Sequence, residues 1–153
     1  MQKITPFLLM DGRAEEAMNL YTSVFRNSKI VDVSRSGDNG PVFSATLELD
    51  GERFILLNVG PKSEFNASVS FFINCETQAE VDELWDKLLA GGGAPMQCGW
   101  LKDKFGVHWQ IIPSALGRLM RDKDPAKSQR VMQAMMKMVK IDVAGLEAAH
   151  RAA

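Results

Sequence analysis

Residues 97–113 read QCGWLKDKFGVHWQIIP and predict a tight turn followed by a strand. The turn is expected at DKFG, because glycine accepts a positive φ and aspartate hydrogen-bonds the backbone just after it. The strand is expected at VHWQII, where β-branched and aromatic residues precede a proline that cannot donate to a sheet ladder. Because side chains alternate along a strand, His108 and Gln110 fall on one face and Trp109 falls on the other.

The composition bounds the class of protein. The chain has 153 residues, 46% hydrophobic and 24% charged content, and a formal net charge of −1. These values are ordinary for one globular domain and give no basic field that would attract nucleic acid. The longest apolar runs are about six residues, whereas a membrane-spanning helix needs roughly 20. A strand is predicted within the first few residues, which leaves no room for a signal peptide. We therefore expect a cytoplasmic protein with neither nucleic acid nor membrane as a partner.

The first half of the chain predicts a β-α unit followed by a sheet. The near-continuous apolar run at residues 4–10 is typical of a strand covered on both faces. A helix is expected over residues 14–25, with Asp11 as its cap and an apolar stripe facing the sheet. The dipeptide Asp50-Gly51 predicts a tight hairpin. Further strands are expected at residues 29–36, 43–49 and 53–59.

The second half repeats this order. An apolar strand is expected at residues 69–75, and TQAE at residues 77–80 predicts a capping box that opens a helix. Three glycines at residues 91–93 close that helix, whereas a phosphate-binding loop would open one. Another strand is expected around residues 95–98, ahead of the turn and strand described above.

A shift of 64 positions superposes the two halves by residue type. The shift matches Phe71 with Phe7 in the first strands and Trp85 with Tyr21 in the helices. The alternative is that any β-α unit resembles any other. Because one offset matches a strand and a helix together, we favour an internal duplication.

The C-terminal region predicts two further helices. Asp124-Pro125 is typical of a helix start, with the helix running to about residue 139 and a short last helix over residues 142–150. Methionine adapts to irregular surfaces, so the apolar stripe of this helix predicts either a partner or dimer surface or packing on its own domain, the more common arrangement. The stripe comprises Val131, Met132, Met135, Met136 and Val139.

Three segments carry a family resemblance: residues 97–113, the opening ITPFLLMDG with AEEA, and residues 129–138. They resemble the PhnB-like branch of the glyoxalase, bleomycin-resistance and dioxygenase superfamily, which has the vicinal oxygen chelate fold. The resemblance implies an α+β class, with paired βαβββ modules whose sheets curl around a pocket, and a homodimer. We accordingly expect one domain over residues 1–153, with modules of about 1–62 and 67–113 and a helical extension over 114–153.

Members of this branch often carry the label 3-demethylubiquinone-9 3-methyltransferase. A nucleoside cofactor is expected on a glycine-rich turn after the first strand. The matching residues 10–13, MDGR, hold one glycine. Methyl transfer is therefore an alternative here, and we expect no cofactor.

Metal-using members of the superfamily place His, Glu or Gln on the first and last strands of each module. The matching positions hold Thr5 or Pro6, residues 55–58, Ser70 and Gln110. A divalent ion prefers imidazole and carboxylate ligands together. We therefore expect no tightly bound metal.

Cys75 and Cys98 are the two cysteines and lack CxxC spacing, so we expect reduced thiols. A nucleophilic Cys98 would need an activating base such as His108 within hydrogen-bond reach.

The leading hypothesis is a small-molecule-binding protein of this fold. The alternatives are a metal-assisted lyase, isomerase or dioxygenase-type enzyme using Gln110, the methyltransferase of the family label, and an interaction module working through the methionine helix. No catalytic residue is assigned, and enzymatic activity is left open. The ligand-binding candidates are Gln110, His108, Ser70, Asn58, Trp100 and Phe72.

Overall fold

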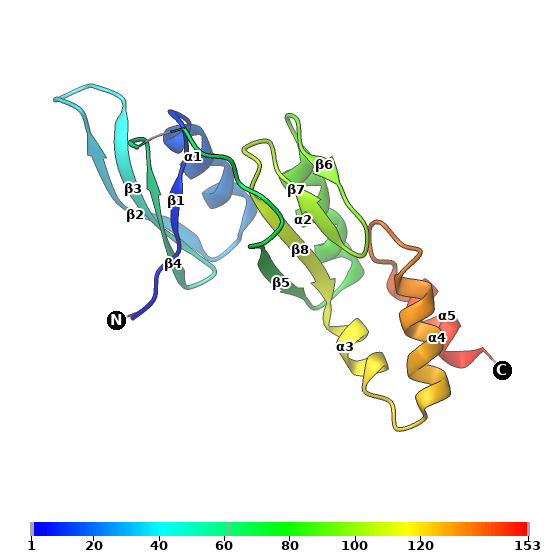
Figure 1. Cartoon of the computed structure of the whole chain (residues 1–153). Helices are drawn as coiled ribbons and strands as arrows, with labels where there is room; N and C mark the ends of the chain where they lie inside the picture. The colour runs from blue at the N-terminus through cyan, green and yellow to red at the C-terminus, as the bar shows by residue number, and fades with distance from the viewer. Residues whose placement is uncertain (1, 61, 153) are drawn as a thin grey trace. The chain divides into compact units, whose positions relative to one another are not determined.

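The computed structural model describes residues 2–60 and 62–152, and the chain divides into two compact units, Met1–Glu64 and Phe65–Ala153. Each unit contains one four-stranded sheet built from a βαβββ module (Figure 1). The predicted α+β class and paired modules are therefore confirmed.

The first unit has the sheet order β1-β4-β3-β2. Strand β1 runs parallel to β4, and the other neighbours are antiparallel. Asp50 and Gly51 have φ values of 49° and 85°, which is the left-handed pair that a tight hairpin between β3 and β4 requires. The elements are β1 (Phe7–Leu9), α1 (Ala14–Val24), β2 (Ser28–Arg35), β3 (Val42–Leu49) and β4 (Glu52–Leu57).

The start of α1 differs from the prediction. Asp11 does not cap the helix, because it lies in a turn with φ 48°. Arg13 occupies the N-cap position, and its side chain makes no capping hydrogen bond but pairs with Glu16. The Asn58 side chain, 44 positions along the chain from Ala14, accepts a hydrogen bond from the Ala14 amide at 2.9 Å. A backbone donor at this helix end is thus satisfied by a residue that follows β4.

The first strand is not covered on both faces, so that prediction is wrong. Leu8 is buried, whereas its neighbour Phe7 keeps 54% of its surface exposed. The buried face belongs to the core formed with α1, where Tyr21, Leu47 and Leu56 are almost completely buried. The opposite face has no helix of this unit over it, so the period of two leaves Phe7 open.

The second unit repeats the topology, with the sheet order β5-β8-β7-β6. Phe71, the first residue of β5, pairs with Trp109 in the parallel strand β8, as Phe7 pairs with Ile55 in β4. Trp85 of α2 is buried, as Tyr21 of α1 is. The 64-residue repeat is therefore visible in both sheet and helix. The elements are β5 (Phe71–Cys75), α2 (Gln78–Leu89), β6 (Ala94–Pro95), β7 (Trp100–Lys102) and β8 (His108–Pro113).

The capping box predicted at the start of α2 is present in the structure. The Thr77 hydroxyl accepts a hydrogen bond from the Glu80 amide at 3.2 Å, and the Glu80 carboxylate accepts one from the Glu76 amide at 2.7 Å. The strand expected at residues 95–98 is misplaced, because Cys98 and Gly99 have φ values of 60° and 82°. Two left-handed residues in a row form a turn, and β7 therefore starts only at Trp100.

The turn between β7 and β8 is organised by one buried carboxylate. Asp103 is 1% exposed, and its Oδ1 accepts hydrogen bonds from the Phe105 and Val107 amides at 2.9 and 3.0 Å. Its Oδ2 accepts one from the Trp109 indole nitrogen at 2.9 Å. Asp103 therefore fixes the turn and also holds the buried indole ring of Trp109, a residue of β8.

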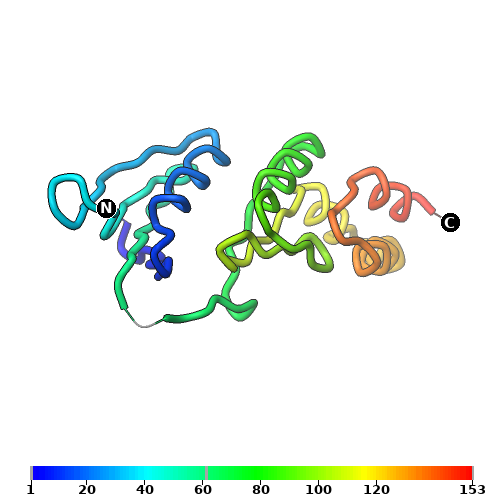
Figure 2. Tube along the Cα trace, turned by 90° about the horizontal axis from the view of Figure 1, so that it is seen from above, coloured from blue at the N-terminus to red at the C-terminus, as the bar shows by residue number. Residues whose placement is uncertain are grey.

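Three helices follow β8, namely α3 (Ser114–Met120), α4 (Pro125–Met135) and α5 (Val143–Arg151). Helix α3 was not predicted from the sequence. Asp124 caps α4 through the Ala126 amide, with proline at the helix start. In Figures 1 and 2, α4 and α5 lie side by side at the C-terminal end of the second unit, where Arg130 donates to the Ala149 carbonyl. Their core contains Ile112, Leu116, Leu119, Val131, Ile141 and Leu146.

This helical extension is fixed to the second module by polar contacts. The Gln78 amide group donates to the Ile141 carbonyl at 3.0 Å and accepts from the Val143 amide at 2.8 Å. Lys140 pairs with Asp82 at 2.8 Å. Gln78 and Asp82 both belong to α2. These contacts attach the extension to the second module, and the two form one compact unit.

The methionine stripe is divided between two environments. Val131 is buried and Met135 packs against the core of the extension. The other three members are exposed, Met132 at 47%, Met136 at 61% and Val139 at 40%. Packing on its own unit therefore accounts for part of the stripe. No helix within residues 2–60 and 62–152 is long and apolar enough to cross a membrane.

Candidate functional site

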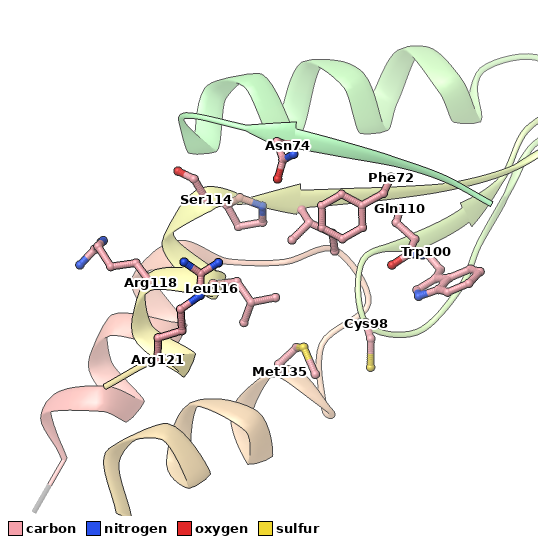
Figure 3. Close-up of a pocket in the computed structure, with 13 residues that line it drawn as sticks. Phe72, Asn74, Cys98, Trp100, Gln110, Ser114, Leu116, Arg118, Arg121 and Met135 are labelled. Atoms are coloured by element: carbon pink, nitrogen blue, oxygen red, sulfur yellow. The ribbon is translucent and has the colours of Figure 1, made fainter. Parts of the chain in front are cut away.

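The second unit contains a pocket of about 630 Å³ between its sheet and the helices α3 and α4 (Figure 3). The floor comes from β5, β7 and β8, and the opposite wall comes from the extension. Pockets of this size with apolar walls and a few polar groups are typical of small-molecule sites. The lining residues are Phe72, Asn74, Cys98, Trp100, Gln110, Ile112, Pro113, Ser114, Leu116, Gly117, Arg118, Arg121 and Met135.

The floor brings together three of the residues that the sequence analysis named. Gln110 in β8 pairs with Phe72 in β5 on one side and with Trp100 in β7 on the other. Directly paired residues point to the same face of a sheet, so the amide lies between the two rings. Phe72 is 55% exposed, which makes one of these rings accessible to a ligand.

Ser70 orients the central amide. The Gln110 Nε2 donates to the Ser70 Oγ at 2.9 Å. Figure 3 shows the Gln110 oxygen directed into the pocket. The bond to Ser70 uses one N–H of the amide and fixes its orientation, so the amide oxygen is the acceptor that faces the pocket.

His108 and Asn58 stand apart from these residues. His108 is 7% exposed and does not line the pocket; its Nδ1 is buried and has no hydrogen-bond partner among the described residues. Asn58 belongs to the first unit, where its Nδ2 donates to the Val42 carbonyl at 2.8 Å while its Oδ1 caps α1. Both polar ends of the Asn58 amide are used in holding the fold.

The two cysteines have different environments. Burial raises the pKa of the Cys75 thiol to about 12, so this thiol stays protonated and unreactive at neutral pH. Cys98 is half-buried, lines the pocket, and has its sulfur 4.0 Å from that of Met136. The structure thus places Cys98 beside a thioether.

Sequence reasoning missed the half of the pocket that the extension supplies. Arg118 lies in α3 and Arg121 follows the last residue of this helix, and both line the pocket. The two arginines are visible in the sequence, but only the presence of helix α3 shows that they belong to the pocket. Arg118 pairs with Glu147 at 3.8 Å, whereas Arg121 has no ion-pair partner among the described residues.

The residues at the superfamily's metal positions do not fit a divalent ion. In the second unit these positions are Ser70 and Gln110, which are hydrogen-bonded to each other, and neither is a carboxylate or an imidazole. Across the part of the chain that the structure describes, no group of three or more His, Cys, Asp or Glu side chains could hold a metal ion.

Comparison with known proteins places these observations in a family. The family described as 3-demethylubiquinone-9 3-methyltransferase matches residues 2–112. A PhnB protein from Bacillus cereus is 40% identical, with a TM-score of 0.68, and 100% of its length is covered by 74% of this chain. No curated protein matches the sequence.

Two more distant solved structures share the fold alone. The fosfomycin resistance protein FosX from Listeria monocytogenes is 11% identical, with a TM-score of 0.53, and the match covers 74% of this chain and 93% of that one. A glyoxylase/bleomycin resistance protein/dioxygenase domain from Frankia sp. is 16% identical, with a TM-score of 0.51, and covers 74% of this chain and 92% of its own.

Proposed function

Because the chain belongs to the 3-demethylubiquinone-9 3-methyltransferase family, the PhnB-like branch of the glyoxalase and bleomycin-resistance superfamily, we propose that it binds a small organic molecule without a tightly bound metal. The observation that carries the proposal is the pocket of about 630 Å³ above β5, β7 and β8. Its aromatic side chains supply binding area, and the Gln110 amide supplies direction.

The methyl transfer of the family label does not fit the turn after β1. The turn after β1 holds Asp11 and Gly12, with φ values of 48° and 83°, and is not the glycine-rich loop that cradles a dinucleotide or nucleoside. The cavity beside this turn is only about 50 Å³, far below the several hundred Å³ of a typical ligand pocket.

A thermal-shift panel of small organic molecules tests the proposal, with each compound measured with and without EDTA. A ligand present at a hundred times its Kd is expected to raise the Tm by roughly 5–10 °C, because it binds the native state alone. The shift should be unchanged by EDTA and reduced by Phe72→Ala. Phe43→Ala is the matched control, since Phe43 is an exposed aromatic residue of the other unit, at 41% against 55%.

Two outcomes would contradict the proposal. One is a panel in which no organic compound raises the Tm. The other is a shift that EDTA abolishes, which would favour the metal-assisted lyase, isomerase or dioxygenase alternative.

We also propose that the protein is a cytoplasmic homodimer. Each unit exposes large apolar side chains, with Phe7 at 54% and Met136 at 61%, and exposed apolar patches commonly mark association surfaces. Light scattering should give twice the 17.0 kDa mass of one chain. The mass of a single chain would contradict the proposal.

A further inference from the structure

We propose that the pocket of the second unit selects planar aromatic carboxylates and that Arg121 binds their carboxylate group. This inference rests on the proposed function, because it names the class of ligand for the same pocket. It goes beyond that function in assigning the specificity to one side chain of the extension.

The charges that line the pocket favour an anion. Among the described residues that line it, two are arginines and none is acidic. Arg118 pairs with Glu147 at 3.8 Å, and in Figure 3 its guanidinium points away from the sheet. One positive charge, that of Arg121, is left without a counter-ion among the residues described, which matches the single charge of a monocarboxylate.

Arg121 lines the pocket from the end of α3. It follows the last residue of α3, and its side chain runs back along the helix over Gly117. A Cβ added at Gly117 would lie 3.5 Å from the Arg121 Nη2, so the guanidinium lies against the surface of α3 at this position. Figure 3 shows the guanidinium directed toward the pocket that Leu116 also lines.

The rest of the pocket suits a flat apolar body. Phe72 and Trp100 rise from the sheet, and Leu116 and Met135 face them from the extension. Aromatic rings bind other flat rings by stacking or edge contacts and thioethers adapt to their shape. The Gln110 oxygen, between the two rings of the floor, would accept a hydrogen bond from a hydroxyl or amino substituent of the ligand.

The anchor lies outside the residues that the family model matches. The family match ends at residue 112, whereas Leu116 and Met135 belong to α3 and α4 and Arg121 directly follows α3. The Bacillus cereus protein is matched over its whole length by 74% of this chain, so the remainder of this chain has no counterpart in it. The carboxylate selectivity is therefore expected to be a property of the extension.

Calorimetric titration with a matched pair of probes tests the inference. The probes are 2-naphthoate and its neutral analogue 2-naphthamide, which share the ring system and differ in charge. We expect the wild-type protein to bind 2-naphthoate roughly tenfold more tightly, since a charge-assisted bidentate pair is stronger than a neutral hydrogen bond. Arg121→Gln should remove this preference. Lys123→Gln removes the same charge two positions away, at an exposed residue that does not line the pocket, and should retain the preference.

The outcomes separate the two levels of the proposal. If both probes bind equally, or if Lys123→Gln lowers the preference as much as Arg121→Gln does, the carboxylate anchor is overturned while the binding pocket stands. If neither probe binds but other panel compounds do, the aromatic class is overturned. If neither the probes nor any panel compound binds, the proposed function itself fails.

Discussion

Asp103→Asn is expected to lower the free energy of unfolding by about 2–4 kcal/mol, because it breaks a buried, fully bonded carboxylate. The carboxylate accepts from two backbone amides and from the Trp109 indole. An asparagine has one acceptor oxygen in place of two, so its NH₂ group must face at least one of these donors. A donor that faces another donor in the interior loses its hydrogen bond and keeps its desolvation penalty.

Urea unfolding followed by tryptophan fluorescence measures this loss. The matched control is Asp38→Asn, the same change at an exposed loop residue, for which a change within about 0.5 kcal/mol is expected. Equal midpoints for the two variants would show that the buried carboxylate is not what holds the turn between β7 and β8.

Gly99→Ala is expected to destabilise the second unit by about 2–4 kcal/mol, from backbone strain and overpacking together. Gly99 has φ 82°, and an added Cβ would lie 2.8 Å from the Ile112 Cδ1 and 2.9 Å from the Ile141 Cγ1. These two side chains belong to the core that joins the sheet to the extension. The added methyl group would therefore push the extension away from the sheet.

Gly37→Ala separates the two contributions. Gly37 has nearly the same φ, 78°, but an added Cβ there would have nothing within 4 Å. This variant should lower the free energy of unfolding by about 1–2 kcal/mol, which is the strain of a left-handed residue alone. Chemical denaturation gives the free energy of unfolding of both variants. The difference between Gly99→Ala and Gly37→Ala measures how closely the extension packs against Gly99. No difference between them would mean that the extension does not pack tightly against Gly99.

The sequence alone determined the elements that obey local rules. Asp50-Gly51 forms its hairpin, Thr77 caps α2, and Asp103 organises its turn, because each depends on residues within a few positions of one another. The alternation along β8 was predictable for the same reason: side-chain direction in a strand follows from chain geometry. The 64-residue repeat and the family resemblance extended these local predictions to the paired modules.

The tertiary structure alone decided which distant groups meet. Asn58, and not Asp11, caps α1, because strand pairing brings the end of β4 to the start of that helix. Phe7 is open on one face because no helix of its unit covers it. Phe72, Gln110 and Trp100 share one floor because of strand register, and Arg121 lines the same pocket because α3 lies opposite that floor. Such contacts depend on pairings across tens of residues, which local propensity does not encode.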